Sequence, residues 1–230
     1  MTTWQDDSRP VKAVIFDMDG LLLDTEGIYT EVTELITRRY GKAFDWAVKQ
    51  NTIGRGARDF SAYIIDTLQL PISVDEFLEM RQPMLEERFP HSPAMPGAEA
   101  LVRHLAAHGI PIAVGTSSSV HYFHAKIERH QAWFELFDTV VTADDPEVTA
   151  AKPAPDIFLV AASRLGVDPA DCVVFEDSPF GVTAAKAAGM RAVAVPDSNM
   201  PRERYQHADL VLDALREAPL AQWGLPALPA

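Results

Sequence analysis

The chain has 230 residues, 47% of them hydrophobic, which is enough to bury a substantial core. Its 33 acidic and 20 basic residues give a formal net charge of −13, which argues against a nucleic-acid partner because such a partner needs a basic surface. No apolar run of 18 residues and no signal peptide appears, and the single cysteine excludes an intramolecular disulfide, so we expect a cytoplasmic protein without a membrane partner.

Short apolar runs followed by polar residues recur along the chain. Residues 11–16 are apolar and β-branched, which predicts a strand buried on both faces of a parallel sheet. Further strands are predicted at 111–115, 139–142, 172–175, 191–195 and 209–212. Helical stretches such as 97–108 and 180–188 separate most of them, so we predict an α/β fold with a doubly wound parallel sheet. The tail, 217–230, is rich in Pro, Leu and Ala and is predicted to pack loosely or fray.

Residues 24–91 interrupt this alternation of strands and helices. They show amphipathic helical patterns and little strand-like sequence, with a capping box at Ser73 and Glu76. We therefore expect a helical cap domain at 24–91, inserted after the first strand. The α/β core would then consist of residues 1–23 and 92–230.

Polar residues follow the predicted strands where each strand ends. Ligands in open α/β sheets bind outside the carboxyl ends of the strands, so these residues are candidates for a site. The set comprises Asp17-Met18-Asp19-Gly20 after the first strand, Thr116-Ser117-Ser118 after the second, Lys152-Pro153 before a helix, and Glu176-Asp177 after the fourth. Each group alone is more often a turn or a helix cap, but together and in this order they indicate one site.

Each member of this set suits a step in phosphate ester chemistry. A carboxylate is a recognised covalent nucleophile. Asp17 stands at the end of its predicted strand, where it can take that role. Asp19 is the candidate to protonate the leaving group and later to take a proton from water. Several carboxylates repel a phosphate unless a hard cation intervenes, so we expect Mg²⁺ bound by Asp17 and Asp177. Lys152 would offset the remaining negative charge.

The other candidates would bind the phosphoryl group or support the metal. We expect the hydroxyl of Thr116 and the backbone N–H groups of Ser117 and Ser118 to bind phosphoryl oxygens, helped by a helix that begins near residue 120. Glu176 either binds the metal through water or orients its neighbours, and the sequence leaves both open.

The ordered set Asp17-x-Asp19, Thr116, Lys152 and Glu176-Asp177 resembles the four motifs of the haloacid dehalogenase superfamily of phosphohydrolases. The resemblance extends over residues 12–199, helical cap included. Residues 16–26 are similar to the branch that holds β-phosphoglucomutase, sugar phosphatases and pseudouridine-5′-phosphatase, and the stretches 68–71, 95–99 and 144–148 resemble pseudouridine-5′-phosphatases most.

The resemblance implies an activity, a cofactor and a substrate class. It implies a Mg²⁺-dependent phosphatase that hydrolyses small phosphate monoesters, sugar phosphates or nucleoside 5′-monophosphates, through an aspartyl-phosphate. The backbone carbonyl of Asp19 becomes a further expected metal ligand. The expected partner is a small phosphorylated metabolite, with pseudouridine 5′-phosphate as the first substrate to test. The sequence does not indicate the oligomeric state.

Three other functions fit parts of the pattern. A phosphomutase of the β-phosphoglucomutase type has a histidine in the first cap helix and an arginine in the cap loop, where this chain has Tyr29 and Ala57, although Arg55 and Arg58 lie close by. Dehalogenation needs no second acid, so Asp19 argues against it. A receiver domain also accepts phosphate on an aspartate, but on a later strand and without an inserted cap.

Four residues of the predicted cap are candidates to contact the leaving group: Glu26, Tyr29, Arg55 and Arg58. A packing or solvent-exposed role is equally compatible with each of them. The sequence alone does not decide between these roles.

Overall fold

The computed structural model describes residues 9–229 of the chain. Within them, six strands form one parallel sheet in the order β3-β2-β1-β4-β5-β6. The strands are β1 (Ala13–Phe16), β2 (Ile112–Gly115), β3 (Thr139–Val141), β4 (Cys172–Glu176), β5 (Arg191–Ala194) and β6 (Leu210–Val211). The predicted fold class is confirmed, and each predicted strand appears within two residues of its expected bounds.

The strand β1 lies in the middle of the sheet. Its Phe16 pairs with Val114 of β2 on one side and with Phe175 of β4 on the other. The chain order reverses at β1, because β2 and β3 lie on one side and β4, β5 and β6 on the other. The carboxyl ends of β1 and β4 therefore meet at the switch point of the sheet, where open α/β folds bind ligands.

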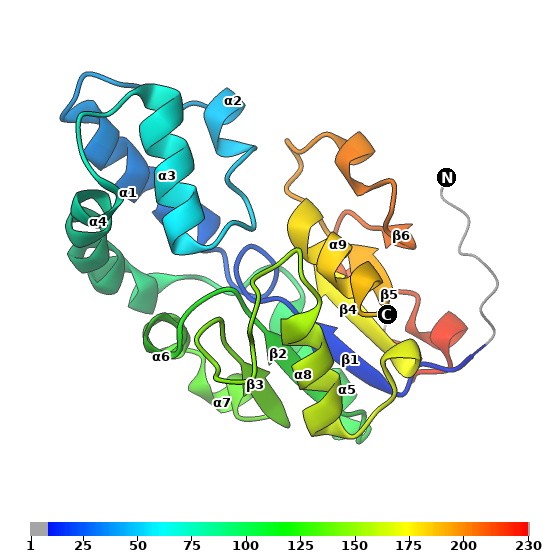
Figure 1. The fold of residues 1–230 in the computed structure, drawn as a ribbon. Helices are drawn as coiled ribbons and strands as arrows, with labels where there is room; N and C mark the ends of the chain where they lie inside the picture. Colours follow the sequence, from blue (N-terminus) through cyan, green and yellow to red (C-terminus); the bar gives the residue numbers. More distant parts are fainter. Residues whose placement is uncertain (1–8, 230) are drawn as a thin grey trace.

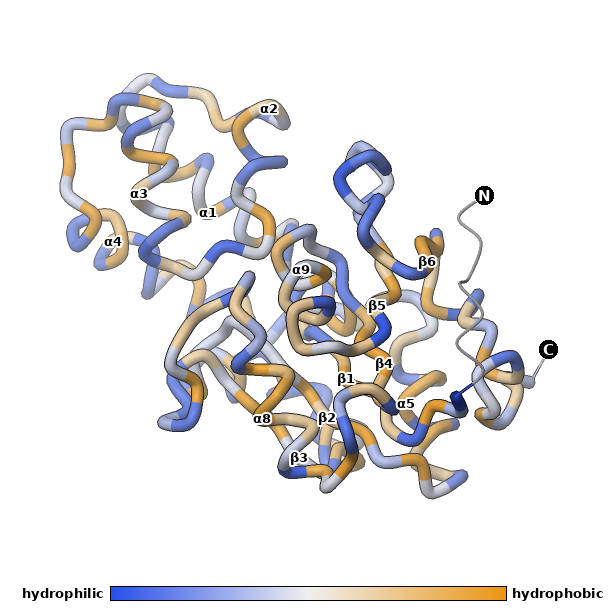
Figure 2. Tube along the Cα trace, turned by 45° about the vertical axis from the view of Figure 1, so that its right-hand side comes forward, coloured by the Kyte–Doolittle hydropathy of each residue, from blue (hydrophilic) through white to orange (hydrophobic). Residues whose placement is uncertain are grey.

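Helices cover both faces of the sheet, which is why its central strands are apolar up to Glu176 at the end of β4 (Figure 1). They are α5 (Ala98–Ala107), α6 (Val120–Ile127), α7 (Gln131–Phe134), α8 (Asp156–Leu165) and α9 (Pro179–Ala187), with short 3₁₀ turns η2 (Pro169–Asp171) and η3 (Arg202–Tyr205). Val14 and Phe16 pack on the face covered by α5, α6 and α7, whereas Ala13 and Ile15 pack on the face covered by α8 and α9. In Figure 2, β2 and β4 carry mainly the hydrophobic colour, inside a more polar periphery.

A group of helices lies between β1 and β2 in the chain and stands apart from the sheet in space (Figure 1). These are α1 (Glu26–Arg38), α2 (Trp46–Lys49), α3 (Ala57–Leu68) and α4 (Val74–Arg88), followed by the 3₁₀ turn η1 (Phe89–His91). They share an apolar core of their own around Val32, Ile64 and Phe77. The predicted capping box at Ser73 and Glu76 starts α4. We call residues 24–91 the cap.

The loop after α2 joins the cap to the sheet domain at one edge. Gly54 has φ +81°, and a Cβ atom there would lie 2.5 Å from Oγ of Ser178 in the loop after β4. Arg204 of η3 donates hydrogen bonds to the carbonyl of Gln50 (2.5 Å) and to Oδ1 of Asn51 (3.0 Å). The cap is thus held against the carboxyl ends of the strands.

The tail packs into the core over residues 218–225, where the prediction that it packs loosely or frays is wrong. The tail forms two 3₁₀ turns, η4 (Leu215–Glu217) and η5 (Leu220–Trp223). Trp223 is 2% exposed, lies 5.8 Å from the ring of Phe175, and accepts a hydrogen bond at its carbonyl from Val11 N–H. Leu220, Trp223 and Leu225 belong to the apolar cluster that contains Phe16 and Phe175 of the sheet. Within residues 9–229, no helix has both the length and the apolar character needed to cross a membrane.

Replacing Trp223 with alanine tests this packing. We expect Trp223→Ala to lower the free energy of unfolding by about 3–5 kcal/mol, because a large buried ring is lost and a cavity remains. Leu159 on α8 is 38% exposed, and Leu159→Ala should change the free energy of unfolding by less than about 0.5 kcal/mol. Urea denaturation of both variants measures the difference, and equal, small effects would show that the tail does not belong to the core.

Candidate active site

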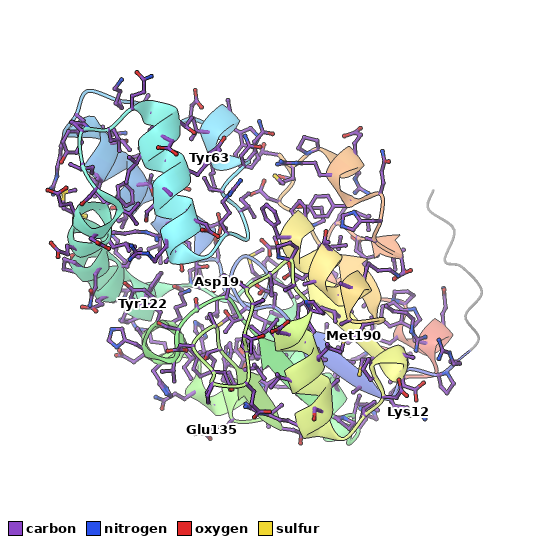
Figure 3. The ribbon with its side chains drawn as sticks, viewed as in Figure 1. Lys12, Asp19, Tyr63, Tyr122, Glu135 and Met190 are labelled. Atoms are coloured by element: carbon purple, nitrogen blue, oxygen red, sulfur yellow. The ribbon has the colours of Figure 1, made fainter. Side chains whose placement is uncertain are left out.

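A cavity of about 640 Å³ lies between the cap and the carboxyl ends of the strands. Figure 3 labels Asp19 at this junction, below the helices of the cap. The core lines it with Asp17, Asp19, Ser117, Ser118, Lys152, Glu176 and Asp177, and the cap with Glu26, Tyr29, Arg55 and Arg58. Residues from distant parts of the chain are thus brought together at the switch point of the sheet.

Lys152 links the ends of three strands, β1, β2 and β4. Its Nζ donates hydrogen bonds to Oδ1 of Asp17 (2.6 Å), to Oε1 of Glu176 (2.7 Å) and to the carbonyl of Gly115 (3.0 Å). Burial lowers the pKa of this lysine, but the carboxylates of Asp17 and Glu176 outweigh burial and raise it overall. Lys152 therefore carries its charge and is fixed beside Asp17.

Glu176 uses both of its oxygens inside the protein. Oε1 binds Lys152, while Oε2 accepts hydrogen bonds from the N–H (2.8 Å) and the hydroxyl (2.9 Å) of Ser178. Of the two roles left open for this residue, the geometry favours orientation of Lys152 and of the loop after β4. Metal binding through water stays a prediction.

Asp17 and Asp177 form a buried concentration of negative charge. Burial raises the pKa of Asp17 to about 7, although Lys152 lowers it. Burial and the nearby carboxylates of Glu176 and Asp17 raise the pKa of Asp177 well above its usual range. Among the described residues, none donates a hydrogen bond to the Asp177 carboxylate, so its charge lacks a partner.

These residues fit a hard cation. The backbone at Gly20, with φ +79°, passes so close to Asp177 that a Cβ atom would lie 2.4 Å from Oδ2, which leaves space beside that oxygen only because no side chain is present. Within residues 9–229, no three His, Cys, Asp or Glu side chains are grouped so as to hold a metal alone. Asp17 and Asp177 would therefore share a Mg²⁺ ion with a backbone carbonyl, water and substrate, as Mg²⁺ prefers.

Asp19 is held by a second buried lysine, Lys126 of α6. Lys126 forms an ion pair with Oδ1 of Asp19, and its Nζ also donates to the hydroxyls of Ser118 (2.6 Å) and Tyr29 (2.8 Å). Thr25 donates to Oδ1 (2.6 Å) and Ser118 to Oδ2 (2.9 Å). Burial alone would raise the pKa of Asp19, but Lys126 and the hydroxyl donors lower it overall.

The loop after β2 is bound to the same network. The Thr116 hydroxyl accepts a hydrogen bond from Ser118 N–H (3.1 Å) and donates to Oδ2 of Asp19 (3.3 Å). Ser117 lines the cavity beside them, and α6 begins at Val120 with Ser119 as its N-cap. In this structure Thr116 and Ser118 bind protein atoms, and their binding of phosphoryl oxygens stays a prediction.

The predicted cap residues differ in how they are held. Tyr29 accepts a hydrogen bond from Lys126, and Glu26 lies 3.8 Å from Nζ of Lys49. Arg55 donates to the carbonyl of Asn51 (2.7 Å) and lies over the rings of Tyr63 and Phe180. Arg58 forms an exposed ion pair with Asp75, so its guanidinium is largely in solvent although it borders the cavity.

Comparison with known proteins identifies the family of this chain. A family model described as haloacid dehalogenase-like hydrolase matches residues 11–189, a range that includes Asp17, Asp19, Lys152 and Asp177. The chain belongs to the haloacid dehalogenase-like hydrolases. The predicted family is therefore confirmed.

Relatives within this hydrolase family carry phosphatase names. The chain is 47% identical over 219 residues to (DL)-glycerol-3-phosphatase 1, mitochondrial, of Arabidopsis thaliana, which covers 93% of this chain and 74% of the relative. It is 44% identical over 222 residues to a probable pseudouridine-5′-phosphatase of Drosophila melanogaster, which covers 95% and 96%.

Solved structures of the family share the fold. A haloacid dehalogenase family hydrolase from Deinococcus radiodurans, with bound phosphate and sodium, has a TM-score of 0.77 and 29% identity, covering 96% of this chain and 99% of that one. CbbY from Rhodobacter sphaeroides, in complex with phosphate, has a TM-score of 0.78 and 26% identity, covering 94% and 100%.

Two buried cations near the site, Lys126 and Arg81, are not among the residues predicted from the sequence motifs. Both lie on the buried face of a helix, Lys126 beside Phe123 on α6 and Arg81 between Phe77 and Leu85 on α4. A charged residue in an apolar stripe at helical spacing was the available signal, because burial of an isolated charge is costly.

The contribution of the ion pair between Lys126 and Asp19 to stability can be tested by substitution. We expect Lys126→Met to lower the free energy of unfolding by about 3–5 kcal/mol, since it leaves Asp19 buried without a counter-charge. Lys186→Met removes a partly exposed ion pair with Asp209 and should cost less than about 1 kcal/mol. Chemical denaturation compares the two, and adding Asp19→Asn to Lys126→Met should recover part of the loss. No recovery would contradict the pairing.

Proposed function

We propose that this haloacid dehalogenase-like phosphatase hydrolyses small phosphate monoesters with Mg²⁺ through an aspartyl-phosphate on Asp17. The observation that carries the proposal is the buried contact between Lys152 and Oδ1 of Asp17, beside Asp19 and Asp177 in one cavity. This contact leaves Oδ2 of Asp17 as the attacking oxygen. We infer that the enzyme acts in the cytoplasm, because a chain with a single cysteine forms no intramolecular disulfide, as is usual in a reducing compartment.

In the first step, Oδ2 of Asp17 forms a bond to phosphorus as the bond between phosphorus and the leaving oxygen breaks. Asp19 donates its proton to that oxygen, so the alcohol leaves neutral. Asp19 needs a proton for this role, and the negative phosphoryl group of a bound substrate favours the protonated form. Lys152 stabilises the charge on the Asp17 carboxylate and on the phosphoryl oxygens.

In the second step, water attacks the phosphorus atom of the aspartyl-phosphate and the bond to Asp17 breaks. Asp19, now a carboxylate, takes a proton from the water, and inorganic phosphate leaves. The ion pair with Lys126 and the hydrogen bonds from Thr25 and Ser118 support this role, because they hold the carboxylate in one position. The cap excludes bulk water from the cavity during both steps.

Asp17, Asp177 and the backbone carbonyl of Asp19 would hold Mg²⁺, which when bound neutralises phosphoryl charge as a Lewis acid. The unpartnered carboxylate of Asp177 and the close approach of Gly20 support this assignment. The Deinococcus radiodurans relative has phosphate and a cation bound.

The proposed substrate is a small phosphorylated metabolite. The names of the relatives point to pseudouridine 5′-phosphate and glycerol 3-phosphate. A net charge of −13 supports a small substrate that is held by local cations, and not a nucleic acid.

Substitution of the two aspartates tests the covalent scheme. We expect Asp17→Asn to lower turnover by about 10⁴-fold or more, because the nucleophile is lost. Asp19→Asn should lower it by about 10²–10⁴-fold, because proton transfer is lost, and should accumulate the phosphoryl adduct. Phosphate release from p-nitrophenyl phosphate measures turnover, and mass spectrometry of acid-quenched peptides locates the adduct. Asp24→Asn, at an exposed position nearby, is the control. Near-normal turnover of Asp17→Asn would rule out the scheme.

Gly20 tests the metal assignment. Gly20→Ala places a Cβ atom against Asp177, so we expect the Mg²⁺ concentration for half-maximal turnover to rise by about 10–100-fold. Gly41→Ala is a matched control, because Gly41 also has positive φ (+68°) but its Cβ atom would meet no other group within 4 Å. Titration of Mg²⁺ after EDTA treatment gives the concentrations. Equal Mg²⁺ dependence of both variants, or full activity in EDTA, would contradict the assignment.

A further inference from the structure

Arg81 is a buried cation in the wall of the cap. It lies on α4 and is 5% exposed. Its guanidinium lies over the rings of Tyr29 (4.8 Å to the centroid) and Phe60 (4.4 Å), so aromatic groups cover it. An arginine that stacks on rings keeps the N–H donors at the edge of its planar group for hydrogen bonds, because the ring contacts use its flat face.

The guanidinium of Arg81 has no hydrogen-bond partner in the part of the chain that the structure describes. Its Nε is completely buried without a partner, and no carboxylate of residues 9–229 forms an ion pair with it. Burial consequently lowers its pKa. A buried, unpaired guanidinium destabilises the fold, so its presence calls for an explanation outside the folded chain.

The cavity supplies that explanation. Arg81 lines the same cavity as Asp17 and Lys152, on the opposite, cap side. Glu26 lines it too, and its nearest cation is Lys49 at 3.8 Å and not Arg81. A donor and an acceptor therefore border one space without binding each other.

We propose that Arg81 and Glu26 form a subsite for the hydroxyl groups of a polyol leaving group. A hydroxyl both accepts and donates, so one or two neighbouring hydroxyls satisfy the guanidinium edge and the carboxylate together. A carboxylate or a second phosphate on the substrate would satisfy Arg81 but repel Glu26. This subsite rests on the proposed function, since the leaving group is that of the proposed hydrolysis.

Such a subsite discriminates against leaving groups that leave its polar side chains without hydrogen bonds. A leaving group without hydroxyls fills the space but leaves the buried guanidinium of Arg81 without a hydrogen bond, and offers none to the partly buried carboxylate of Glu26. We therefore expect a preference for hydroxylated esters over alkyl esters of equal length. The preference should depend on Arg81 and not on the residues that transfer the phosphoryl group.

Two substrates that differ only in hydroxyl groups test the proposal: glycerol 3-phosphate and n-propyl phosphate. We expect the full chain with Mg²⁺ to show a kcat/KM about tenfold or more higher for glycerol 3-phosphate. Arg81→Met keeps the length and packing of the side chain but removes its donors, and should bring this ratio close to one, mainly through a higher KM for glycerol 3-phosphate. Activity on n-propyl phosphate should not fall, since no hydrogen bond to it is lost and no guanidinium is left unpaired beside it.

Two further variants separate binding from folding. Arg88 lies on the same helix and pairs with Glu31, so Arg88→Gln should leave the substrate ratio unchanged. Arg81→Lys keeps the charge and should retain more of the preference than Arg81→Met. The thermal midpoint of Arg81→Met should equal or exceed that of the unmodified chain, because an unpaired buried charge is removed.

Several results would overturn the subsite. Equal loss on both esters with a lower thermal midpoint would show that Arg81 only supports the fold. An unchanged ratio in Arg81→Met would show that it does not contact the leaving group, and a loss confined to 2-phosphoglycolate would assign it to carboxylates. If the unmodified chain hydrolyses p-nitrophenyl phosphate but prefers neither ester, the subsite fails and the proposed function stands. If it hydrolyses none of these esters, the proposed function fails as well.

Discussion

The structure depends on the burial of negative charge where β1 and β4 end. Asp17, Asp19, Glu176 and Asp177 all lie there, at the switch point of a parallel sheet whose two central strands β1 and β4 are otherwise apolar. Buried carboxylates are stable only when they are paired or bound to a cation. The positions of the lysines, of the serine and threonine hydroxyls and of the loops around the cavity all follow from that requirement.

Two lysines pair with different carboxylates of this group. Lys152 reaches across from the segment before α8 and binds Asp17 and Glu176, while Lys126 binds Asp19 from α6. Each lysine comes from a different crossover connection, so each ion pair also ties a helix layer to the strand ends. In the folded chain the pKa of Asp17 is raised and that of Asp19 is lowered. The proposed roles therefore require a bound cation to favour the Asp17 carboxylate and the negative phosphoryl group to favour the proton on Asp19.

The sequence predicted the sheet, and most of the residues that it singled out at the strand ends line one cavity, because both produce local signals. Buried parallel strands are continuous apolar runs, and the site residues follow them directly. The tail, Lys126 and Arg81 were missed for a physical reason: their roles come from contacts with distant segments. Trp223 packs against Phe175, and Arg81 is enclosed by rings from two other helices. Composition and spacing within one segment do not contain such contacts.

The charges that the protein leaves without a partner show where ligands belong. Glu176, Asp19 and both lysines are paired within the chain, and their role is to fix geometry. Asp177 and Arg81 are buried to a similar extent, line one cavity, and have no hydrogen-bonding partner for the carboxylate or guanidinium among the described residues. Each of these unpaired charges destabilises the fold. A cation bound at Asp177 and a leaving group bound at Arg81 would remove that cost, and the free energy recovered would strengthen their binding. The core end would then serve the chemistry and the cap end the choice of substrate.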